Sequence, residues 1–488
     1  MGIKREHLIL FLTFLVAFGF RLLFLFRVPF YSSDEAYFNL RHSKYILQHF
    51  FPLIYDPQSY GGNIILNTHV FHYFLAFFNS TLPDVVVYKL LPALLASSIV
   101  FIVYLLAKEL TQNEYASLFA ALLSAFIPSF IGATINQISI LSVFVPLFLL
   151  TLYFLLEIER KKMWFFASVI ILVLLQPLNL LMLFTLLFFG ILIFAESLTL
   201  KREEVDGMGL FVVFFLLVNL ILYKQLYLKQ GLATIWGNLP LELYGQIFQN
   251  FNLFETVASV GVIPLLLGVA GFILYKRKSR VMILLSAVLA ADFSLLLLRI
   301  IAFRDGIIFL AIILCIVSAV SMAKIMEYLP LTKIAKKSKL IISIFIILTV
   351  TTLLIPSTTS ALKVVHTGVT PAEIEALHWI KFNTAHDSVI AANAYEGNLI
   401  ISIADRTNVI DTEFLRADSR ILDVQTIFTT ESVVKAKKAL DNYGVQYVYF
   451  SDKTKALYDV RELKYASDEN CFQEVFKNGF ATIYKVVC

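Results

Sequence analysis

The chain has 488 residues, of which 59% are hydrophobic and 15% are charged, and its formal net charge is +5. A soluble globular domain is about half apolar and about a quarter charged, so this composition excludes an ordinary soluble protein and predicts an α-helical, polytopic membrane protein. The sequence contains no basic stripe with interleaved aromatic residues, which excludes nucleic acid as an expected partner.

Apolar runs long enough to cross a bilayer recur from Leu8 to Pro356. A spanning helix needs about 20 such residues, and on this basis we predict about eleven transmembrane helices. The predicted spans lie approximately at 8–26, 86–108, 114–131, 137–157, 163–176, 178–197, 208–224, 258–275, 281–298, 306–326 and 339–356.

The basic residues predict the orientation of these spans. Cytoplasmic loops carry an excess of Lys and Arg. If the N-terminus is cytoplasmic, every basic cluster falls on the cytoplasmic side; the clusters are Lys4-Arg5, Lys108, Arg160 to Lys162, Lys201-Arg202, Lys276 to Arg280 and Lys333 to Lys339. The protein is therefore expected to be a multi-pass protein of the cell membrane with its C-terminal domain extracytoplasmic.

Two parts of the chain are predicted. Residues 1–356 form a transmembrane domain with large outward loops at 27–85 and 225–257, and residues 357–488 form a small extracytoplasmic α/β domain. Thr370-Pro371-Ala-Glu373 is typical of a helix start, and the short strands expected near 389–392, 408–411, 445–450 and 481–487 alternate with helical segments. Cys471 and Cys488 both lie in this domain, either as a disulfide or as two unrelated thiols.

The first outward loop opens with Ser33-Asp34-Glu35. Two adjacent acids near a membrane surface are costly unless something uses or pairs them. They can act as a general base or as ligands of a divalent cation. Alternatively, Ser33 is a helix N-cap and the acids lie in a first turn that the helix dipole favours. His69 and His72 of the same loop are expected to be surface histidines.

Arg299 and Arg304 lie at the outward end of the ninth predicted span, about two turns after Asp292. Such an arginine pair can hold the phosphate of a lipid carrier. The alternative is that both side chains extend to the headgroups and that Asp292 pairs with Arg299 or stays neutral.

The string Asp34-Glu35-Ala-Tyr37-Phe-Asn39-Leu-Arg41 resembles the first-loop acidic motif of GT-C glycosyltransferases. Its first half is similar to transferases that use polyprenyl phosphate sugars, and its second half is similar to catalytic subunits of archaeal oligosaccharyltransferases. Further stretches that resemble the latter are Ile127 to Phe130, Glu375 to Ile380, Ala404 to Thr407 and Val475 to Tyr484. The resemblance covers most of the chain and is weak between about 140 and 280.

The resemblance implies a role for each site residue. Asp34 would deprotonate or orient the acceptor with Glu35 as its partner, and Arg304, helped by Arg299, would bind the donor phosphate. The residues expected to contact the acceptor or substrate are Tyr37, Arg41, His69, Tyr395, Glu242 and Glu255, the last two as alternatives for a late-loop glutamate.

The sequence departs from the family pattern at two places. Ile127 to Phe130 leads into Asn136-Gln-Ile-Ser139, which has no carboxylate where the family has a second acidic motif. The family's WWDYG acceptor motif is reduced to the Tyr-x-Gly pattern of Asn393-Ala-Tyr395-Glu-Gly397. Asp34 alone remains as an expected ligand for Mg²⁺ or Mn²⁺, which favours a lipid monophosphate donor with weak or no metal dependence.

The expected function is transfer of a sugar from a polyprenyl (dolichyl-type) phosphate carrier to a glycan or protein acceptor on the extracytoplasmic side. Two alternatives remain: an oligosaccharyltransferase-like transfer of a lipid-linked glycan to protein asparagine, and a non-catalytic scaffold or lipid-glycan flippase. The sequence has no Walker loop, dinucleotide fingerprint or Cys/His metal spacing, so a soluble activated cofactor is not expected.

Overall fold

A computed structural model describes residues 5–175, 178–236, 252–275, 279–333, 335–417 and 419–488. The chain divides into two compact units. The helical unit comprises Met1–Pro29, Leu82–Lys224 and Leu241–His366, and the mixed unit comprises Phe30–Thr81, Gln225–Pro240 and Thr367–Cys488.

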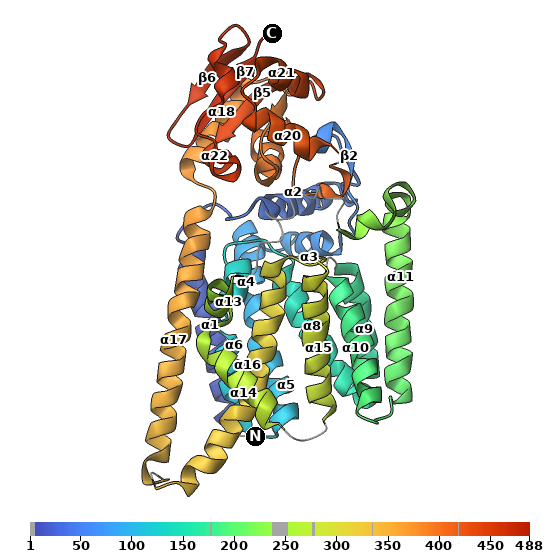
Figure 1. The fold of residues 1–488 in the computed structure, drawn as a ribbon, viewed down its shortest axis with the longest axis vertical. Coiled ribbons are helices and arrows are strands. Elements are labelled where there is room, and N and C mark those ends of the chain that lie inside the picture. Colours follow the sequence, from blue (N-terminus) through green and yellow to red (C-terminus); the bar gives the residue numbers. More distant parts are fainter. Residues whose placement is uncertain (1–4, 176–177, 237–251, 276–278, 334, 418) are drawn as a thin grey trace. The chain divides into compact units, whose positions relative to one another are not determined.

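The helical unit is built of helices and short helical turns (Figure 1). Its α-helices are α1 (Arg5–Leu25), α4 (Leu91–Ser97), α5 (Ile99–Thr111), α6 (Glu114–Ser124), α7 (Pro128–Thr134), α8 (Leu141–Leu156), α9 (Ile158–Leu175), α10 (Asn179–Ala195), α11 (Arg202–Gln230), α13 (Leu253–Val260), α14 (Val262–Leu274), α15 (Arg280–Leu297), α16 (Phe303–Tyr328) and α17 (Ser338–Thr367). A π-helical turn, η2 (Val86–Leu90), precedes α4, and two 3-10 turns follow α16 (η4, Leu329–Leu331; η5, Ala335–Lys337). The 3-10 turn after α11 (η3, Gly231–Trp236) belongs to the mixed unit.

Six helices of the described residues are long and apolar enough to cross a membrane, and the number is eight if each of two bent pairs forms one span. The bends are 49° between α6 and α7 and 89° between α13 and α14. The predicted class, a multi-pass helical membrane protein, is confirmed. The predicted total of about eleven is larger by three, because it also counts α8, α9 and α10. Helices α8 and α10 have 16 and 17 residues and extend only about 25 Å against a hydrocarbon core of about 30 Å, and α9 carries the charged run from Glu159 to Lys162 near its start.

Helix α16 is the centre of the helical unit, because 89% of its most apolar segment is buried. Helix α14 approaches it closely at two glycines. A Cβ atom on Gly268 would lie 2.8 Å from the backbone oxygen of Leu314, and one on Gly271 would collide with that of Val317. Ser321 Oγ also donates to the Leu267 carbonyl at 2.7 Å. Small residues and hydroxyl groups at such a contact are typical of packed membrane helices.

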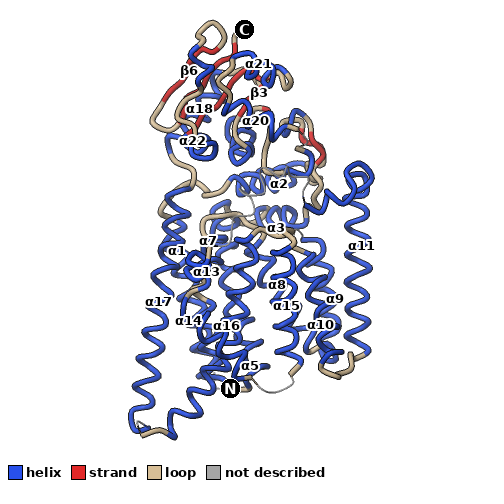
Figure 2. Tube along the Cα trace, in the orientation of Figure 1, coloured by secondary structure: helices blue, strands red, loops and turns tan. Residues whose placement is uncertain are grey.

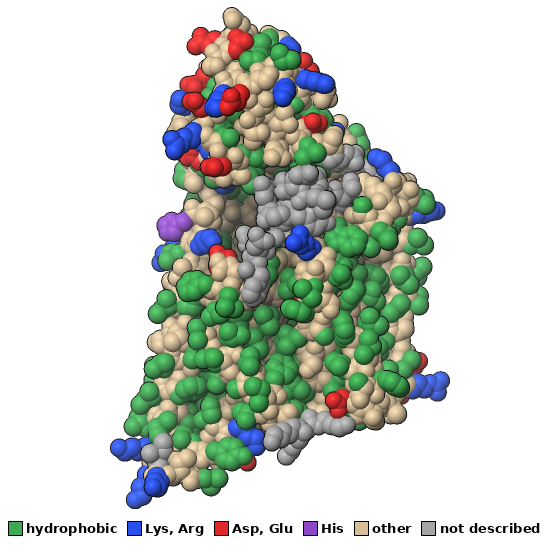
Figure 3. All heavy atoms as spheres, in the orientation of Figure 1, with side chains coloured by type: hydrophobic (Ala, Val, Ile, Leu, Met, Phe, Trp, Pro, Cys, Tyr) green, Lys and Arg blue, Asp and Glu red, His purple; other side chains and the backbone are tan. Residues whose placement is uncertain are grey.

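Helices α11 and α17 bury little of their apolar surface within the structure, 22% and 17% of their most apolar segments. Ile221 of α11 and Ile347 and Ile355 of α17 are exposed. The face of the helical unit seen in Figure 3 is covered mainly by hydrophobic side chains. Lipid chains would cover such a surface, as expected for a protein that the bilayer surrounds.

The mixed unit is organised around a five-stranded sheet in the order β4-β3-β5-β7-β6. Its strands are drawn in red in Figure 2, where β3 and β6 are labelled. The strands are β3 (Val389–Ala391), β4 (Thr407–Asn408), β5 (Val445–Ser451), β6 (Phe472–Lys477) and β7 (Ala481–Val486). Strand β3 pairs in parallel with β4 and β5, whereas β7 pairs antiparallel with β5 and β6. The α/β character predicted for the end of the chain is confirmed, and β6 is a strand that the sequence analysis did not predict.

Helices and turns connect and cover this sheet. They are α18 (Pro371–Asn383), η6 (Ala394–Glu396), α19 (Gly397–Leu399), η7 (Ile400–Ala404, a π-helical turn), η8 (Phe414–Arg416), α20 (Arg420–Thr429), α21 (Val433–Asp441), α22 (Asp452–Tyr458) and η9 (Lys464–Ser467). At the predicted start of α18, Thr370 and Glu373 form a reciprocal capping box. This arrangement satisfies two backbone N–H groups that would otherwise lack a partner.

The first outward loop folds as part of the mixed unit. It contains α2 (Asp34–His49), β1 (Tyr55–Asp56), η1 (Ser59–Gly61), β2 (Asn63–Ile64) and α3 (Val70–Asn79). Tyr37 of α2 lies in one hydrophobic core with Leu377, Ile380, Ile390 and Ile483. This division differs from the predicted boundary after residue 356, which falls inside α17, because the loop buries apolar surface against the C-terminal segment.

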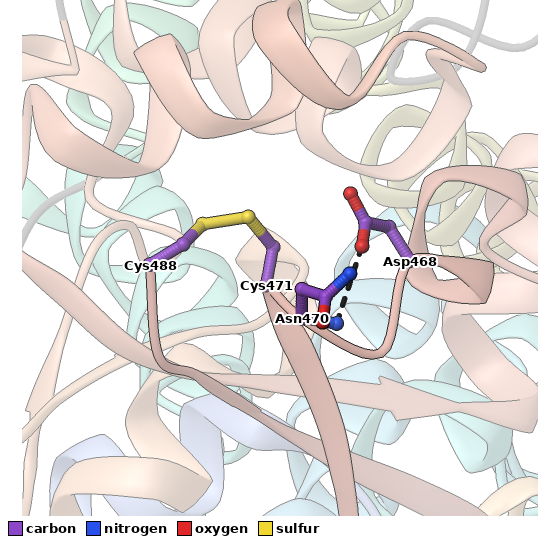
Figure 4. The surroundings of a disulfide bond; sticks show 4 residues. All are labelled: Asp468, Asn470, Cys471 and Cys488. Carbon is purple, nitrogen blue, oxygen red and sulfur yellow. Dashed lines mark hydrogen bonds between the residues drawn. A yellow bond between two sulfur atoms is a disulfide. The ribbon is translucent and has the colours of Figure 1, made fainter.

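Cys471 and Cys488 form a disulfide that ties the start of β6 to the C-terminus (Figure 4). Of the two alternatives left open by the sequence, the structure therefore contains the bond. The backbone N–H of Cys471 donates to the Asp468 carbonyl at 3.0 Å, and the N–H of Val487 donates to the Cys471 carbonyl at 2.9 Å. Disulfides persist in oxidising compartments, which agrees with an extracytoplasmic domain.

Candidate active site

The acidic pair begins helix α2. Ser33 is the N-cap, and its hydroxyl accepts a hydrogen bond from the Ala36 N–H at 3.2 Å. Asp34 and Glu35 therefore lie in the first turn, where the helix dipole favours negative charge. The capping interpretation of this sequence is correct, and it leaves the carboxylates available for a second role.

The Asp34 side chain is buried, and the C-terminal segment supplies its partners. Asn398 Nδ2 donates to Asp34 Oδ2 at 2.7 Å, and the backbone N–H of Leu399 donates to Asp34 Oδ1 at 3.0 Å. Both donors belong to α19, more than 360 positions away along the chain. Each oxygen retains a lone pair that can accept a further proton or hydrogen bond.

Burial raises the pKa of Asp34 to about 7, and the negative charge of Asp411 also raises it. The hydrogen bonds from Asn398 and Leu399 stabilise the carboxylate and lower the pKa in part. Both protonation states are therefore accessible near neutral pH. A general base is most effective when its pKa is close to the working pH.

Residues 411–413 contact the amide of Asn398 that donates to Asp34. Asn398 Nδ2 also donates to Thr412 Oγ1 at 3.2 Å, so one amide joins Asp34 to this segment. Asp411 accepts hydrogen bonds from Ser59 Oγ at 2.7 Å and from the N–H of Glu413 at 2.9 Å. Tyr60 Oη donates to the Asp411 carbonyl at 3.0 Å. The first loop thus holds this segment through η1.

Glu413 brings another acid to the site. Its pKa is raised to about 7, mainly by burial and also by the negative charges of Asp411 and Glu35. Glu35 and Glu413 are therefore electrostatic neighbours, although they come from opposite ends of the chain. A carboxyl group that stays partly protonated near neutral pH can both donate and accept hydrogen bonds.

The acids do not form a metal cage. Among the residues that the structure describes, no three His, Cys, Asp or Glu side chains are placed to hold a metal ion. The two Asp34 oxygens already face N–H donors, whereas a divalent cation requires several converging oxygen ligands. The residues present do not fit the Mg²⁺ or Mn²⁺ ion considered for Asp34.

Two predicted substrate contacts of α2 have other partners. Arg41 forms a two-pronged ion pair with the buried carboxylate of Asp56, with Nη2 to Oδ1 at 2.9 Å, and it also donates to Gln58 Oε1 at 2.9 Å. Tyr37 is 5% exposed within the core of the mixed unit. Both side chains thus anchor α2 in the mixed unit.

His69 and His72 are buried, not on the surface as expected, because α3 packs along α2. Their Nδ1 atoms are 3.2 Å apart, and His72 Nε2 lies 2.8 Å from Asn39 Oδ1. His42 completes a cluster of three neighbouring rings. Burial lowers the pKa of His69 to about 4, so this histidine is neutral near pH 7.

Tyr395 lies in η6, three residues before Asn398. Its side chain is 42% exposed and its ring makes an edge-to-face contact with Phe414 at 6.3 Å between centroids. Asn393 caps this turn by accepting the N–H of Tyr395 at 2.8 Å. The Tyr-x-Gly pattern thus places an exposed aromatic ring next to the segment that holds Asp34.

The predicted phosphate-binding residues belong to the helical unit, where Arg299 follows α15 and Arg304 lies in the first turn of α16. Arg304 is 63% exposed, and its Nε lies 3.7 Å from Asp305 Oδ1. Arg299 is also exposed and adopts a left-handed backbone conformation with φ 52°. Glu255 is exposed in the first turn of α13, and Glu242 lies outside the described residues.

The predicted residues are thus divided between the two units. Asp34, Glu35, Tyr37, Arg41, His69 and Tyr395 belong to the mixed unit, and Arg299, Arg304 and Glu255 belong to the helical unit. The sequence analysis did not find Asn398, Asp411 or Glu413. Only the Tyr-x-Gly pattern next to Asn398 pointed toward this segment, because no local signal reveals hydrogen bonds across such a sequence separation.

No protein-family model matches this chain, and no curated protein matches it in sequence. Solved structures share its fold. The oligosaccharyltransferase of Archaeoglobus fulgidus in the apo form has a TM-score of 0.71 at 13% identity, covering 99% of this chain and 74% of that chain. Archaeal oligosaccharyltransferase AglB from A. fulgidus, in complex with an inhibitory peptide and a dolichol-phosphate, has a TM-score of 0.62 at 15% identity, covering 91% and 69%.

ArnT from Cupriavidus metallidurans, bound to undecaprenyl phosphate, has a TM-score of 0.58 at 11% identity and covers 98% of both chains. ArnT and the archaeal enzyme are both GT-C membrane glycosyltransferases. Identities this low establish the fold alone. The chain therefore has a GT-C-like fold, as the resemblance of its first-loop motif predicted.

Gly397 offers a test of how the site is assembled. A Cβ atom there would lie 2.7 Å from Asp411 Cα and would collide with the Ile410 carbonyl. We expect Gly397→Ala to push α19 away from residues 410–411, to weaken the hydrogen bonds to Asp34, and to lower the melting temperature by several degrees. Gly479→Ala is the matched control, because nothing lies within 4 Å of its Cβ position. Equal melting temperatures for the two variants would contradict this assembly.

Proposed function

We propose that this protein is a membrane glycosyltransferase that transfers a sugar from a polyprenyl phosphate carrier to an acceptor on the extracytoplasmic side. The observation that carries the proposal is the Asp34 carboxylate, buried in a GT-C-like fold with its pKa raised to about 7. Supporting it are solved structures of the same fold, one in complex with a dolichol-phosphate and one bound to undecaprenyl phosphate.

In the proposed reaction, Asp34 accepts the proton of the acceptor group. The acceptor atom forms a bond to the anomeric carbon of the donor sugar, while the bond from that carbon to the phosphate oxygen breaks. The electron pair of that bond leaves with the lipid phosphate, whose added negative charge Arg304 and Arg299 stabilise. Preorganised cations at a site of developing charge are usually a large catalytic term.

Glu35 and the neighbours of Asp34 adjust this base. Asn398 and Leu399 each donate one hydrogen bond to the Asp34 carboxylate, which fixes its orientation before substrate binds. Each oxygen still has a lone pair that can accept a proton. Glu35 adds negative charge beside Glu413 and thereby favours protonation of the surrounding acids. The reaction uses no metal ion at Asp34, in keeping with the donors that face its oxygens.

The orientation proposed for this reaction follows from the basic clusters between the predicted spans. They place the N-terminus in the cytoplasm and Asp34 on the opposite side. A lipid-linked donor fits that side, because the sugar and phosphate lie at the membrane surface while the prenyl chain stays in the bilayer. The partners are accordingly the lipid-linked donor, the bilayer and the acceptor.

A second candidate is an oligosaccharyltransferase-like transfer of a lipid-linked glycan to protein asparagine. It is favoured by the higher TM-score with the A. fulgidus oligosaccharyltransferase than with ArnT. The two candidates differ in their dependence on a divalent cation. Transfer from a dolichyl phosphate monosaccharide should keep most of its rate in EDTA, whereas complete loss that Mg²⁺ or Mn²⁺ restores would favour the second candidate.

The role of Asp34 is tested by Asp34→Asn, which keeps the shape of the side chain and removes its basicity. We expect transfer from dolichyl phosphate monosaccharides by the reconstituted full chain to fall by at least about 100-fold. Asp387→Asn is the matched control, since Asp387 is an exposed acid of the same unit. Transfer by Asp34→Asn at the control rate would contradict a general-base role and leave the scaffold interpretation.

The pH dependence tests the neighbours of Asp34. Activity should rise with pH through about 7 as Asp34 loses its proton. Asn398→Ala removes a hydrogen bond that stabilises the carboxylate, so its rising limb should move to higher pH. Asp411→Asn removes a repulsive charge, so its limb should move to lower pH. Pre-steady-state rates from pH 5 to 9 would measure both shifts, and shifts in the same direction would contradict this electrostatic account.

A further inference from the structure

The two segments that Asn398 joins to Asp34 present a surface whose chemistry points to the class of the acceptor. Two aromatic rings, Tyr395 and Phe414, meet edge to face, and Tyr395 is 42% exposed. An aromatic ring offers a flat apolar face, and the tyrosine adds a polar group at its rim. The C–H face of a sugar ring is also flat and apolar, so it can pack on such a platform.

Glu413 adjoins this aromatic pair through the chain itself, because it directly precedes Phe414. Its backbone is held on both sides: its N–H donates to Asp411 Oδ1 at 2.9 Å, and its carbonyl accepts Tyr60 Oη at 3.2 Å. The side chain is partly buried. No described residue donates a hydrogen bond to its carboxylate, although Glu35 and Asp411 repel it. An acid at a position fixed so firmly can accept hydrogen bonds from a ligand that supplies donors.

The same segment connects this surface to the base. Asn398 Nδ2 donates both to Asp34 Oδ2 and to Thr412 Oγ1, the residue before Glu413. Tyr395 belongs to the same stretch as Asn398 and lies three residues before it. The aromatic platform and the carboxyl group thus belong to two short stretches, 393–399 and 411–414, and the amide of Asn398 joins both stretches to the base, Asp34 of α2.

We propose that Tyr395, Phe414 and Glu413 form a saccharide-binding surface, and that the acceptor of the transfer reaction is a sugar hydroxyl. The inference rests on the proposed function and specifies its acceptor. The sugar packs its C–H face on Tyr395, donates one hydroxyl to Glu413 and presents another to Asp34. Hydrogen bonds from hydroxyl groups to carboxylates are strong and short. The aromatic pair of Tyr395 and Phe414 favours a sugar over a metal ion as the ligand of Glu413, because a metal ion makes no use of an apolar ring face.

Saturation-transfer NMR on the full chain tests this surface, in nanodiscs prepared without glycoside detergents. The probes are methyl glycosides of glucose, mannose, galactose and N-acetylglucosamine, with an Asn-x-Thr peptide as the competing class. We expect at least one glycoside to receive saturation from the wild type. Glu413→Gln and Tyr395→Ala should raise its Kd at least about 10-fold, the loss expected for a hydrogen bond to a charged group or for a stacked ring.

Matched variants keep the result interpretable. Glu431→Gln changes an exposed acid that pairs with Lys464, and Phe382→Ala removes an exposed ring of α18; both should bind as the wild type does. Tyr395→Phe keeps the platform and should retain binding even if Tyr395→Ala folds poorly. Absence of binding by all four glycosides, unchanged binding by Glu413→Gln and Tyr395→Ala, or binding of the peptide at this surface would overturn the proposal. A full transfer rate in Asp34→Asn would instead remove only the proposed catalytic role of Asp34.

Discussion

Two hydrogen bonds to Asp34, from Asn398 Nδ2 and from the backbone of Leu399, join the first outward loop to the C-terminal segment. A buried carboxylate without donors would cost several kcal/mol. The burial of Asp34 at the start of α2 therefore depends on the donors that α19 supplies. The shape of α19 depends in turn on Gly397, which lets the helix lie against residues 410–411. The site is thus a product of folding across the whole mixed unit.

The same contacts set the chemistry of the aspartate. Burial and the charge of Asp411 disfavour the carboxylate, whereas Asn398 and Leu399 favour it. The opposing effects leave the pKa of Asp34 near neutrality. A carboxylate with such a pKa can accept a proton near neutral pH without a metal ion beside it, and the Asn136 to Ser139 segment contains no carboxylate.

The two units meet different physical demands. In the helical unit, apolar residues face outward on α11 and α17 and small residues mediate the close contact of α14 with α16. In the mixed unit, apolar residues are gathered in a core, and Arg41 and Asp56 satisfy each other in a partly buried polar network. This difference follows from the surroundings of each part. Water favours the burial of apolar side chains, whereas a bilayer is as apolar as the side chains themselves and provides no such driving force.

Several features could be predicted from the sequence because they depend on neighbouring residues. Composition and apolar runs determined the membrane class, Ser33 and Thr370 determined two helix starts, and alternating residues determined β3, β5 and β7. The described residues contain six to eight helices that are long and apolar enough to span a membrane, fewer than the eleven predicted, since apolar runs alone do not give the length or the charge distribution of α8, α9 and α10. The sequence predicted substrate contacts for Tyr37, Arg41 and His69 but not the partners that these side chains have in the mixed unit.

What only the tertiary structure decided is which distant residues surround the acidic pair. Asn398, Asp411 and Glu413 carry no local signature, since an amide or an acid in a turn is common on any surface. Their importance arises from pairing across more than 350 positions, and pairing of that kind is set by the packing of a complete core. The sequence by itself determined that Asp34 and Glu35 begin a helix outside the spans. The fold decided that Asp34 is buried, held by two donors, and poised between its two protonation states.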